Sequence, residues 1–187
     1  MLSSGRNKIQ DDTWELRQVE DFSEFINFDC DDSDLNDFIQ KDANDHAIQL
    51  LAKTYSLKPI AAGGKIPPVA FISLMNDAIP LSETQKKELP DKKQRYRYYP
   101  AVKIARLGVQ KIFQGRNIGT HLINLTKIIF TTNNRTGCRF LTVDAYNQEK
   151  VIKFYNKNDF KFLKNPKPQN RTCQMFYDLL RFKIQDA

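Results

Sequence analysis

The chain has 187 residues, of which 41% are hydrophobic and 27% charged, a composition typical of a folded domain with its own core. No apolar run approaches the ~20 residues that span a membrane, and the N-terminal stretch lacks the apolar segment of a signal peptide. Three cysteines without a C-x-x-C pair favour reduced thiols in the cytoplasm. The two histidines, His46 and His121, lie far apart, so we expect no metal site. The composition predicts one cytoplasmic, metal-free domain over residues 1–187.

Charge is distributed unevenly along the chain. Residues 11–45 contain 13 Asp or Glu and two Lys or Arg, a balance of −11, and the whole chain carries +7, which leaves +18 for the rest. Such asymmetry favours a polyanionic partner or an anionic cofactor on the basic part of the chain. The alternative is a surface charged only for solubility. The acidic segment is expected to lie away from any nucleic acid, where it could receive a basic partner.

Hydrophobic spacing predicts the secondary structure in chain order. The first half is predicted to contain a strand at 14–19, a helix at 31–51, and strands at 53–58 and 69–75 joined by a turn at Gly63-Gly64. Residues 76–100 are predicted to be a loop with a short helix. The second half is predicted to contain strands at 102–109, 140–146, 160–163 and 173–179 and helices at 118–130 and 149–156. This order favours an α/β (α+β) fold, a mixed sheet of about six to seven strands with helices on both faces.

The segment Gly108–Thr120, GVQKIFQGRNIGT, joins a predicted strand to a predicted helix. The first N–H groups of a helix lack internal partners and, with the helix dipole, attract anions. Gly115 and Gly119 let a ligand approach the backbone closely, and Arg116 can add a charge-assisted contact to a phosphate. The glycine spacing matches neither a Walker loop nor a Rossmann fingerprint. A plain strand-to-helix turn is therefore the alternative to a phosphate site.

Two motifs point to one family. Gln114-Gly-Arg-Asn-Ile-Gly119 resembles the Q/R-x-x-G-x-G/A motif of the GNAT N-acetyltransferase superfamily, and Lys153-Phe-Tyr-Asn-Lys-Asn-Asp-Phe160 resembles its x-x-Y-x-x-x-G-F segment. The resemblance covers about residues 100–180 and implies a sheet splayed where acetyl-CoA binds as co-substrate. The residues that it implies for acetyl-CoA binding are Leu107, Gly108, Val109, Gln114, Gly115, Arg116, Asn117, Ile118, Gly119, Thr120 and Asn147.

The sequence departs from the family at two glycines. Asn117 stands at the central glycine of the loop motif, and Asp159 stands at the glycine before Phe160. Asparagine is among the few residues that adopt a left-handed backbone at modest cost, and it also caps helix N-termini well. We expect both substitutions to be accommodated.

The resemblance implies that Tyr155 is catalytic, as the acid that protonates the departing thiolate. A backbone N–H of the splayed strand would polarise the thioester carbonyl. The alternative for Tyr155 is a core aromatic on the apolar face of its helix. No general base is evident, and Asp144 and Glu149 are the fallback candidates. An α-amine, with a pKa of about 7.7–8.0, is partly neutral without a base, whereas a lysine amine at about 10.4 is not.

The N-terminal half indicates a subgroup. The stretch from Phe28 to Ile39, FDCDDSDLNDFI, resembles the F-x-C-x(4)-L-N-x-F-L opening of TacT-like GNAT toxins, and Ala105-Arg-Leu-Gly-Val109 resembles their G-R-L-A-V strand. This resemblance implies a translation-inhibiting toxin of a toxin-antitoxin pair. Such a toxin acetylates the α-amine of aminoacyl-tRNA, and a ribbon-helix-helix antitoxin neutralises it.

Basic residues interleaved with tyrosines agree with an RNA partner. Residues 92–99, KKQRYRYY, and seven Lys or Arg within 150–171 could hold phosphates and stack exposed bases. The nucleic-acid candidates are Lys92, Lys93, Arg95 and Arg97. Three alternatives stay open: an N-acetyltransferase for a small amine or a protein N-terminus, a non-catalytic acyl-CoA- or RNA-binding module, and a basic face that serves only CoA. The sequence also leaves open whether the chain is a homodimer.

Overall fold

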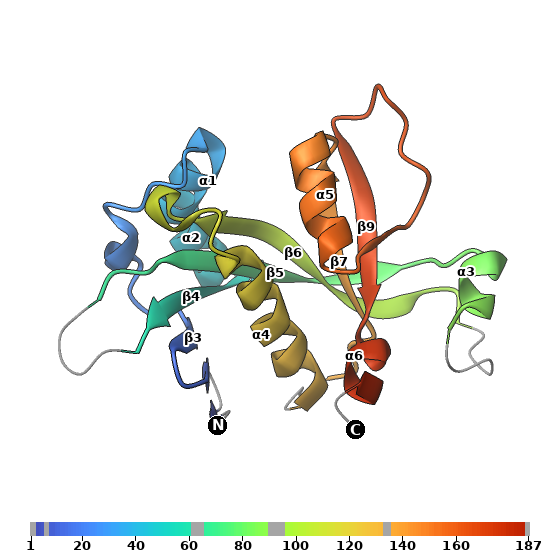
Figure 1. Ribbon diagram of the computed structural model, residues 1–187, viewed down its shortest axis with the longest axis horizontal. Coiled ribbons are helices and arrows are strands. Elements are labelled where there is room, and N and C mark those ends of the chain that lie inside the picture. Colours follow the sequence, from blue (N-terminus) through green and yellow to red (C-terminus); the bar gives the residue numbers. More distant parts are fainter. Residues whose placement is uncertain (1–2, 6–7, 61–65, 90–95, 133–135, 186–187) are drawn as a thin grey trace. The chain divides into compact units, whose positions relative to one another are not determined.

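The computed structural model describes residues 3–5, 8–60, 66–89, 96–132 and 136–185 (Figure 1). The chain divides into two compact units. The first consists of Met1–Met75 and Ala105–Thr126, and the second consists of Asn76–Ile104 and Lys127–Ala187. The prediction of a single domain stays a prediction. Within the described ranges, no helix is both long enough and apolar enough to cross a membrane.

Antiparallel strands form the sheet of the first unit. Their order is β1 (Ser3–Gly5), β2 (Lys8–Gln10), β3 (Trp14–Gln18), β4 (Lys53–Pro59) and the first part of β5 (Ala70–Ile79). Along β3, Leu16 is fully buried between half-buried neighbours. Leu16 therefore points into the core of this unit from the middle of β3. The core of this unit contains four phenylalanine rings, in which Phe71 contacts Phe25, Phe28 and Phe38.

The helical segment of the first unit is interrupted. It comprises the 3-10 turn η1 (Phe22–Phe25), then α1 (Ser33–Asp37), the π-helical turn η2 (Phe38–Asp42) and α2 (Ala43–Ile48). The carboxylate of Asp32 caps α1 by accepting from the Leu35 N–H at 3.1 Å, as the cluster of acidic residues at this helix start suggests. The π turn buries Phe38 and Ile39 together. The helix predicted over 31–51 is therefore present over 33–48, with a π turn in its middle.

Helix α2 ends in a left-handed turn at an unusual residue. The Leu50 N–H donates to the Ala47 carbonyl at 3.2 Å, and the Leu51 N–H donates to the His46 carbonyl at 2.9 Å. This pattern is a Schellman motif, in which the residue after the C-cap is usually glycine. Here that residue is Leu50, with φ of 60° and a side chain that is 88% exposed.

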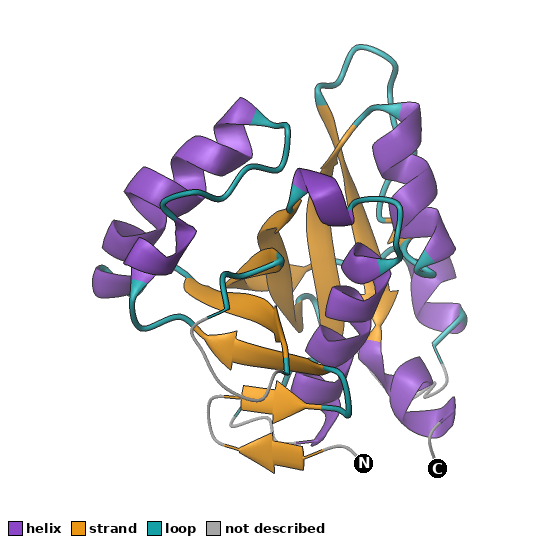
Figure 2. Ribbon diagram, turned by 60° about the vertical axis from the view of Figure 1, so that its left-hand side comes forward, coloured by secondary structure: helices purple, strands orange, loops and turns teal. Residues whose placement is uncertain are grey.

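The second unit has its own sheet and core. Its strands lie in the order β6 (Tyr99–Val109), β7 (Phe140–Tyr146), β9 (Thr172–Asp178) and β8 (Lys161–Phe162). β6 and β7 are parallel and the other pairs antiparallel, so the sheet is mixed as predicted. The helices of this unit, coloured purple with the others in Figure 2, are α3 (Glu83–Lys87), α5 (Glu149–Lys157) and α6 (Leu179–Gln185). β5, β6 and α4 (Ile118–Thr132) contribute residues to both units.

The structure contains the seven predicted strands and adds two short ones, β1 and β2. The prediction of a loop over 76–100 is wrong at both ends of that range. β5 continues to Ile79, which is fully buried, and the Asp77 carboxylate accepts from the Thr142 hydroxyl at 2.6 Å. β6 begins at Tyr99, which is 1% exposed. The predicted turn at Gly63-Gly64 lies outside the described residues.

Candidate active site

The loop between β6 and α4 contains two left-handed residues. After the 3-10 turn η3 (Lys111–Phe113), Gly115 has φ of 76° and Asn117 has φ of 60°. No atom lies within 4 Å of the position that a Cβ on Gly115 would take. The backbone angle, and not crowding, therefore favours glycine at 115. Asn117 adopts the left-handed conformation, one of the two accommodations expected of asparagine at this position.

The loop presents N–H groups at the start of α4. The first hydrogen bond into the helix runs from the His121 N–H to the Asn117 carbonyl, at 3.0 Å. The N–H groups of Ile118, Gly119 and Thr120 precede it, and groups at these positions of a helix lack internal partners. Within the described part of the chain, the N–H groups of Gly115 and Arg116 have no hydrogen-bond partner either. These donors and the positive end of the helix dipole suit an anion.

Side chains anchor this loop within its own unit. The Gln114 amide nitrogen donates to the Cys30 carbonyl at 2.8 Å and to the Val109 carbonyl at 3.1 Å. The Lys111 ammonium lies 2.8 Å from the Asp31 carboxylate, and the Lys111 N–H donates to the Asp29 carbonyl at 2.9 Å. The Gln114 N–H itself donates to the Lys111 carbonyl at 3.3 Å, so its place in a phosphate cradle is weaker than that of Gly115.

Gly108, near the end of β6, is another of the residues predicted to bind acetyl-CoA. A Cβ on Gly108 would lie 2.5 Å from the Phe71 ring, so glycine is required there by the aromatic core. Leu107 and Val109, on the other face of the strand, are half-buried.

Tyr155 lies in the last turn of α5, where the chain forms a second Schellman motif. The Phe160 N–H donates to the Tyr155 carbonyl at 3.1 Å, and the Asp159 N–H donates to the Asn156 carbonyl at 3.0 Å. Asp159, after the C-cap, is left-handed with φ of 65°, and the rings of Tyr155 and Phe160 lie 5.3 Å apart. The spacing Y-x-x-x-D-F therefore corresponds to a helix end with its usual apolar contact, and Asp159 occupies the position where glycine is common.

The side chain of Tyr155 is buried. The side chain is 6% exposed, and its ring contacts Phe154 and Phe160. Burial raises the pKa of the Tyr155 phenol above its usual value, because the charged phenolate is poorly solvated there. Tyr155 is thus a core aromatic, and it also keeps a proton at neutral pH that it could donate.

The other predicted residues of the second unit already have partners. The Asn147 amide donates to the Lys167 and Asn170 carbonyls, both at 3.1 Å. Its donors hold the loop before β9, and only its oxygen is left for a ligand. The fallback bases are paired too. Asp144 lies 2.9 Å from Lys103, and Glu149 lies 2.6 Å from Lys153.

The basic and tyrosine-rich run is described only in part. Lys92, Lys93 and Arg95 lie outside the described residues. The Arg97 guanidinium lies 5.6 Å from the Tyr98 ring centroid. Tyr96 and Tyr98 are 64% and 53% exposed, whereas Tyr99 belongs to the core. Two tyrosines of this run therefore present ring faces that bases could stack on.

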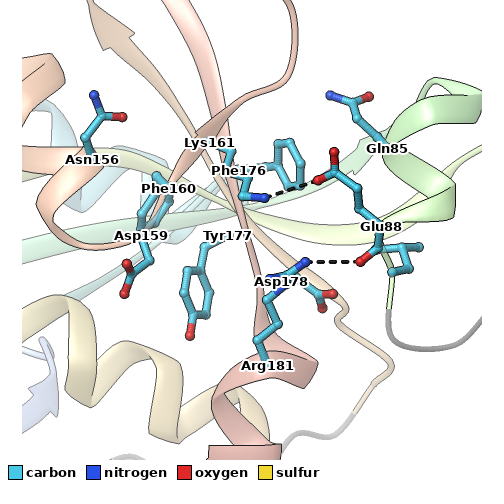
Figure 3. Close-up of a pocket in the computed structure, with 11 residues that line it drawn as sticks. Gln85, Glu88, Asn156, Asp159, Phe160, Lys161, Phe176, Tyr177, Asp178 and Arg181 are labelled. Carbon is cyan, nitrogen blue, oxygen red and sulfur yellow. Dashed lines mark hydrogen bonds and ion pairs between the residues drawn. The ribbon is translucent and has the colours of Figure 1, made fainter.

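A cavity of about 380 Å³ in the second unit lies between α3, the end of α5 and the start of α6 (Figure 3). Lys161 lies 3.1 Å from the Glu88 carboxylate, and the Arg181 guanidinium donates to the Glu88 carbonyl at 3.1 Å. Asp178, on its wall, pairs with Arg139 at 2.6 Å. The charged groups of this cavity largely neutralise one another, and we assign it no part in the chemistry.

The mixed sheet and its helices match the GNAT fold. The chain is similar to KacT, solved as a tyrosine-to-phenylalanine mutant, with a TM-score of 0.72 and 21% identity over 92% of this chain and 99% of that one. It is also similar to AtaT complexed with acetyl-methionyl-tRNAfMet, with a TM-score of 0.73 and 19% identity over 93% and 99% of the two chains. AtaTR bound with AcCoA gives a TM-score of 0.68 and 18% identity over 95% and 100%. No protein-family model and no curated protein sequence matches the chain. The fold class predicted from the sequence is confirmed.

Proposed function

We propose that the chain is an acetyl-CoA-dependent N-acetyltransferase that acetylates the α-amine of aminoacyl-tRNA in the cytoplasm. The observation that carries this proposal is the loop before α4, in which left-handed Gly115 and Asn117 present N–H groups at a helix start. The likeness to AtaT, which has been solved with acetyl-CoA and with acetyl-methionyl-tRNAfMet, supports both the donor and the acceptor.

In this proposal the loop holds the donor by its phosphates. Acetyl-CoA supplies an acetyl group as a thioester. The N–H groups of Gly115, Arg116 and Ile118 to Thr120 bind the pyrophosphate, and the exposed Arg116 side chain adds charge. Residues 107–109 of β6 pair with the pantetheine arm, and a backbone N–H of this strand polarises the thioester carbonyl.

Tyr155 acts on the leaving group. The neutral α-amine attacks the carbonyl carbon, a C–N bond forms and the C–S bond breaks. The phenol of Tyr155 gives its proton to the departing thiolate, and solvent takes the proton that the amine loses and restores the phenol. A phenol with an ordinary pKa of about 10 is protonated at neutral pH, so the proton is available for that step. A base is not required, because an α-amine with a pKa of about 7.7–8.0 is partly neutral at physiological pH.

The proposed biological role is that of a toxin with an antitoxin partner. AtaT is described as a toxin and has been solved bound to the C-terminus of the antitoxin AtaR, and the AtaT-AtaR complex has been solved bound to DNA. For this chain we propose a ribbon-helix-helix antitoxin as partner and tRNA as the ligand of its basic residues.

The proposal is tested by incubating the chain with labelled acetyl-CoA and charged tRNA. Label should appear on the aminoacyl group, and binding of tRNA should weaken steeply with salt. Transfer only to a free amino acid or a protein N-terminus would contradict the choice of acceptor. Acetyl-CoA binding without turnover on any acceptor would identify a non-catalytic module. Expression of an active chain should also arrest growth.

A further inference from the structure

A buried lysine lies at the end of the helix that carries Tyr155. Lys127, on α4, is 4% exposed. Its ammonium donates to the Asn158 carbonyl at 3.3 Å and lies 3.9 Å from the Tyr177 ring centroid. Burial lowers the pKa of Lys127, and the charge of Asp159 acts in the opposite direction. A buried ammonium is costly unless its surroundings compensate it, so these contacts need an explanation.

The position of Lys127 is that of a cap supplied by another helix. Asn158 is the C-cap of α5, and the last carbonyls of a helix have no partner within it. The C-terminal end of a helix dipole is negative, so a cation there is stabilised. The face of the Tyr177 ring adds a cation–π contact. The three features account for a lysine that is otherwise surrounded by protein.

The same turn sets the backbone of Tyr155. Asn158 donates through its N–H to the Tyr155 carbonyl at 3.0 Å and through its side chain to the Phe154 carbonyl at 2.8 Å. Lys127 donates to the Asn158 carbonyl, and Asn158 lies in the turn that connects Tyr155 to Phe160. The hydrogen bond from Lys127 therefore holds that turn. The glycine-free turn, with left-handed Asp159, has fewer low-energy alternatives once Asn158 is held.

We infer that Lys127 is a positioning residue for Tyr155 in acetyl transfer, an inference that rests on the proposed function. It touches neither donor nor acceptor. It holds the last turn of α5 so that the Tyr155 hydroxyl stays where the thiolate leaves. Without it the turn has more freedom, and a small misplacement of an acid lowers turnover strongly.

The kinetic test uses Lys127→Met, which keeps the length of the side chain and removes its charge. Loss of a buried charge offsets loss of its hydrogen bond, so we expect a thermal midpoint near that of the wild type. The kcat should fall by about tenfold, with the KM for acetyl-CoA within about twofold. The matched control is Lys41→Met, an exposed lysine of the acidic 11–45 segment, which should leave kcat unchanged.

A double-mutant cycle separates positioning from general damage. If Lys127 acts through Tyr155, then Lys127→Met should cause no further loss of kcat in a Tyr155→Phe background. Additive losses, or a changed KM with an unchanged kcat, would overturn the inference. Lys127→Gln keeps one donor and serves as the second variant if the methionine variant does not fold. It should show a smaller loss of kcat with the same non-additivity.

A spectroscopic measurement tests the inference without any activity. In protein labelled with ¹³C on the tyrosine rings, the signal that disappears in Tyr155→Phe belongs to Tyr155. That signal should shift or broaden in Lys127→Met and stay in place in Lys41→Met. An unmoved signal would refute the positioning role even in an active enzyme. A moved signal in a chain that transfers no acetyl group would instead refute the proposed function alone.

Discussion

The ends of α2 and α5 have the same backbone and different surroundings. Each closes with two hydrogen bonds of the Schellman type and a left-handed residue that is not glycine, Leu50 with φ of 60° and Asp159 with φ of 65°. At α5 the rings of Tyr155 and Phe160 pack together, and the ammonium of Lys127 binds the C-cap carbonyl. At α2 the side chain of Leu50 is 88% exposed, and that of Leu51 is 50% exposed.

The same backbone hydrogen bonds form the turn at both helix ends. The two ends differ in the side chains that contact the turn. Left-handed backbone costs an ordinary residue roughly 1–2 kcal/mol, and both helix ends tolerate it. Lys127 of α4 binds the end of α5, and Tyr155, the proposed acid, lies in the last turn of that helix. Changes at α2 should therefore affect stability alone, whereas changes at α5 should affect turnover.

The largest expected effect is the loss of turnover on substitution of Tyr155, in the last turn of α5. Tyr155→Phe keeps the packing on Phe160 and removes the proton donor. It should lower turnover on charged tRNA by about 10²-fold or more and leave acetyl-CoA binding unchanged in calorimetry. His46 occupies the equivalent position of α2, with its ring 5.4 Å from Phe38, so His46→Phe is the matched control. Full activity of Tyr155→Phe would remove Tyr155 from the mechanism.

The second-largest effect is expected on stability, at Leu50, the left-handed residue that follows α2. Leu50→Gly removes the backbone penalty and loses almost no buried surface, so it should raise the free energy of unfolding by about 1 kcal/mol. Urea denaturation monitored by circular dichroism measures this change, and turnover should not respond. A loss of stability would mean that the Leu50 side chain makes contacts outside the monomer.

A smaller effect is expected at the loop before α4. Asn117→Gly keeps the left-handed angle and restores the residue usual in the motif, so affinity for acetyl-CoA should stay the same or rise by up to about threefold. Titration calorimetry at fixed salt provides the measurement. A large loss of affinity would show that the asparagine side chain, and not the backbone, binds the ligand.

The smallest change is expected for Asp159→Gly. Aspartate tolerates the left-handed region better than leucine does, so relief of strain should contribute only about 0.5 kcal/mol or less. The substitution also removes the charge that raises the pKa of Lys127, which offsets part of the gain. Urea denaturation of Asp159→Gly and Leu50→Gly side by side compares the two changes in the free energy of unfolding. A larger increase for Asp159→Gly than for Leu50→Gly would contradict this order.

The sequence predicted those features that depend on local chemistry. The strands, the start of α4 and the left-handed angles at Asn117 and Asp159 agree with the motifs that suggested them. Leu50 gave no signal, because leucine is not associated with left-handed backbone. Asn76 and Asp77, both polar, concealed the last part of β5, because Asp77 is paired with Thr142, a residue distant in sequence.

Lys127 was missed for a similar reason. Its partners, the Asn158 carbonyl and the Tyr177 ring, lie 31 and 50 positions further along the chain. One local sign was present. Lys127 is four residues after Ile123, which is fully buried, and residues with this spacing share a helix face. A lysine on an apolar stripe should therefore prompt a search for a distant acceptor.

The anchoring of the loop before α4 has a consequence for amide exchange. Carbonyls bind the N–H groups of Lys111 and Phe113, and the side chain of Gln114 fastens the loop to the chain near Cys30. The backbone amides of Lys111 and Phe113 should exchange slowly with deuterium in the free protein, whereas those of Gly115 and Arg116 should exchange quickly. An anion that binds the loop should protect only the second pair. The exchange rates of Gly115 and Arg116 would then show whether an anion occupies the loop, and the amides of Lys111 and Phe113 would serve as the reference in the same protein.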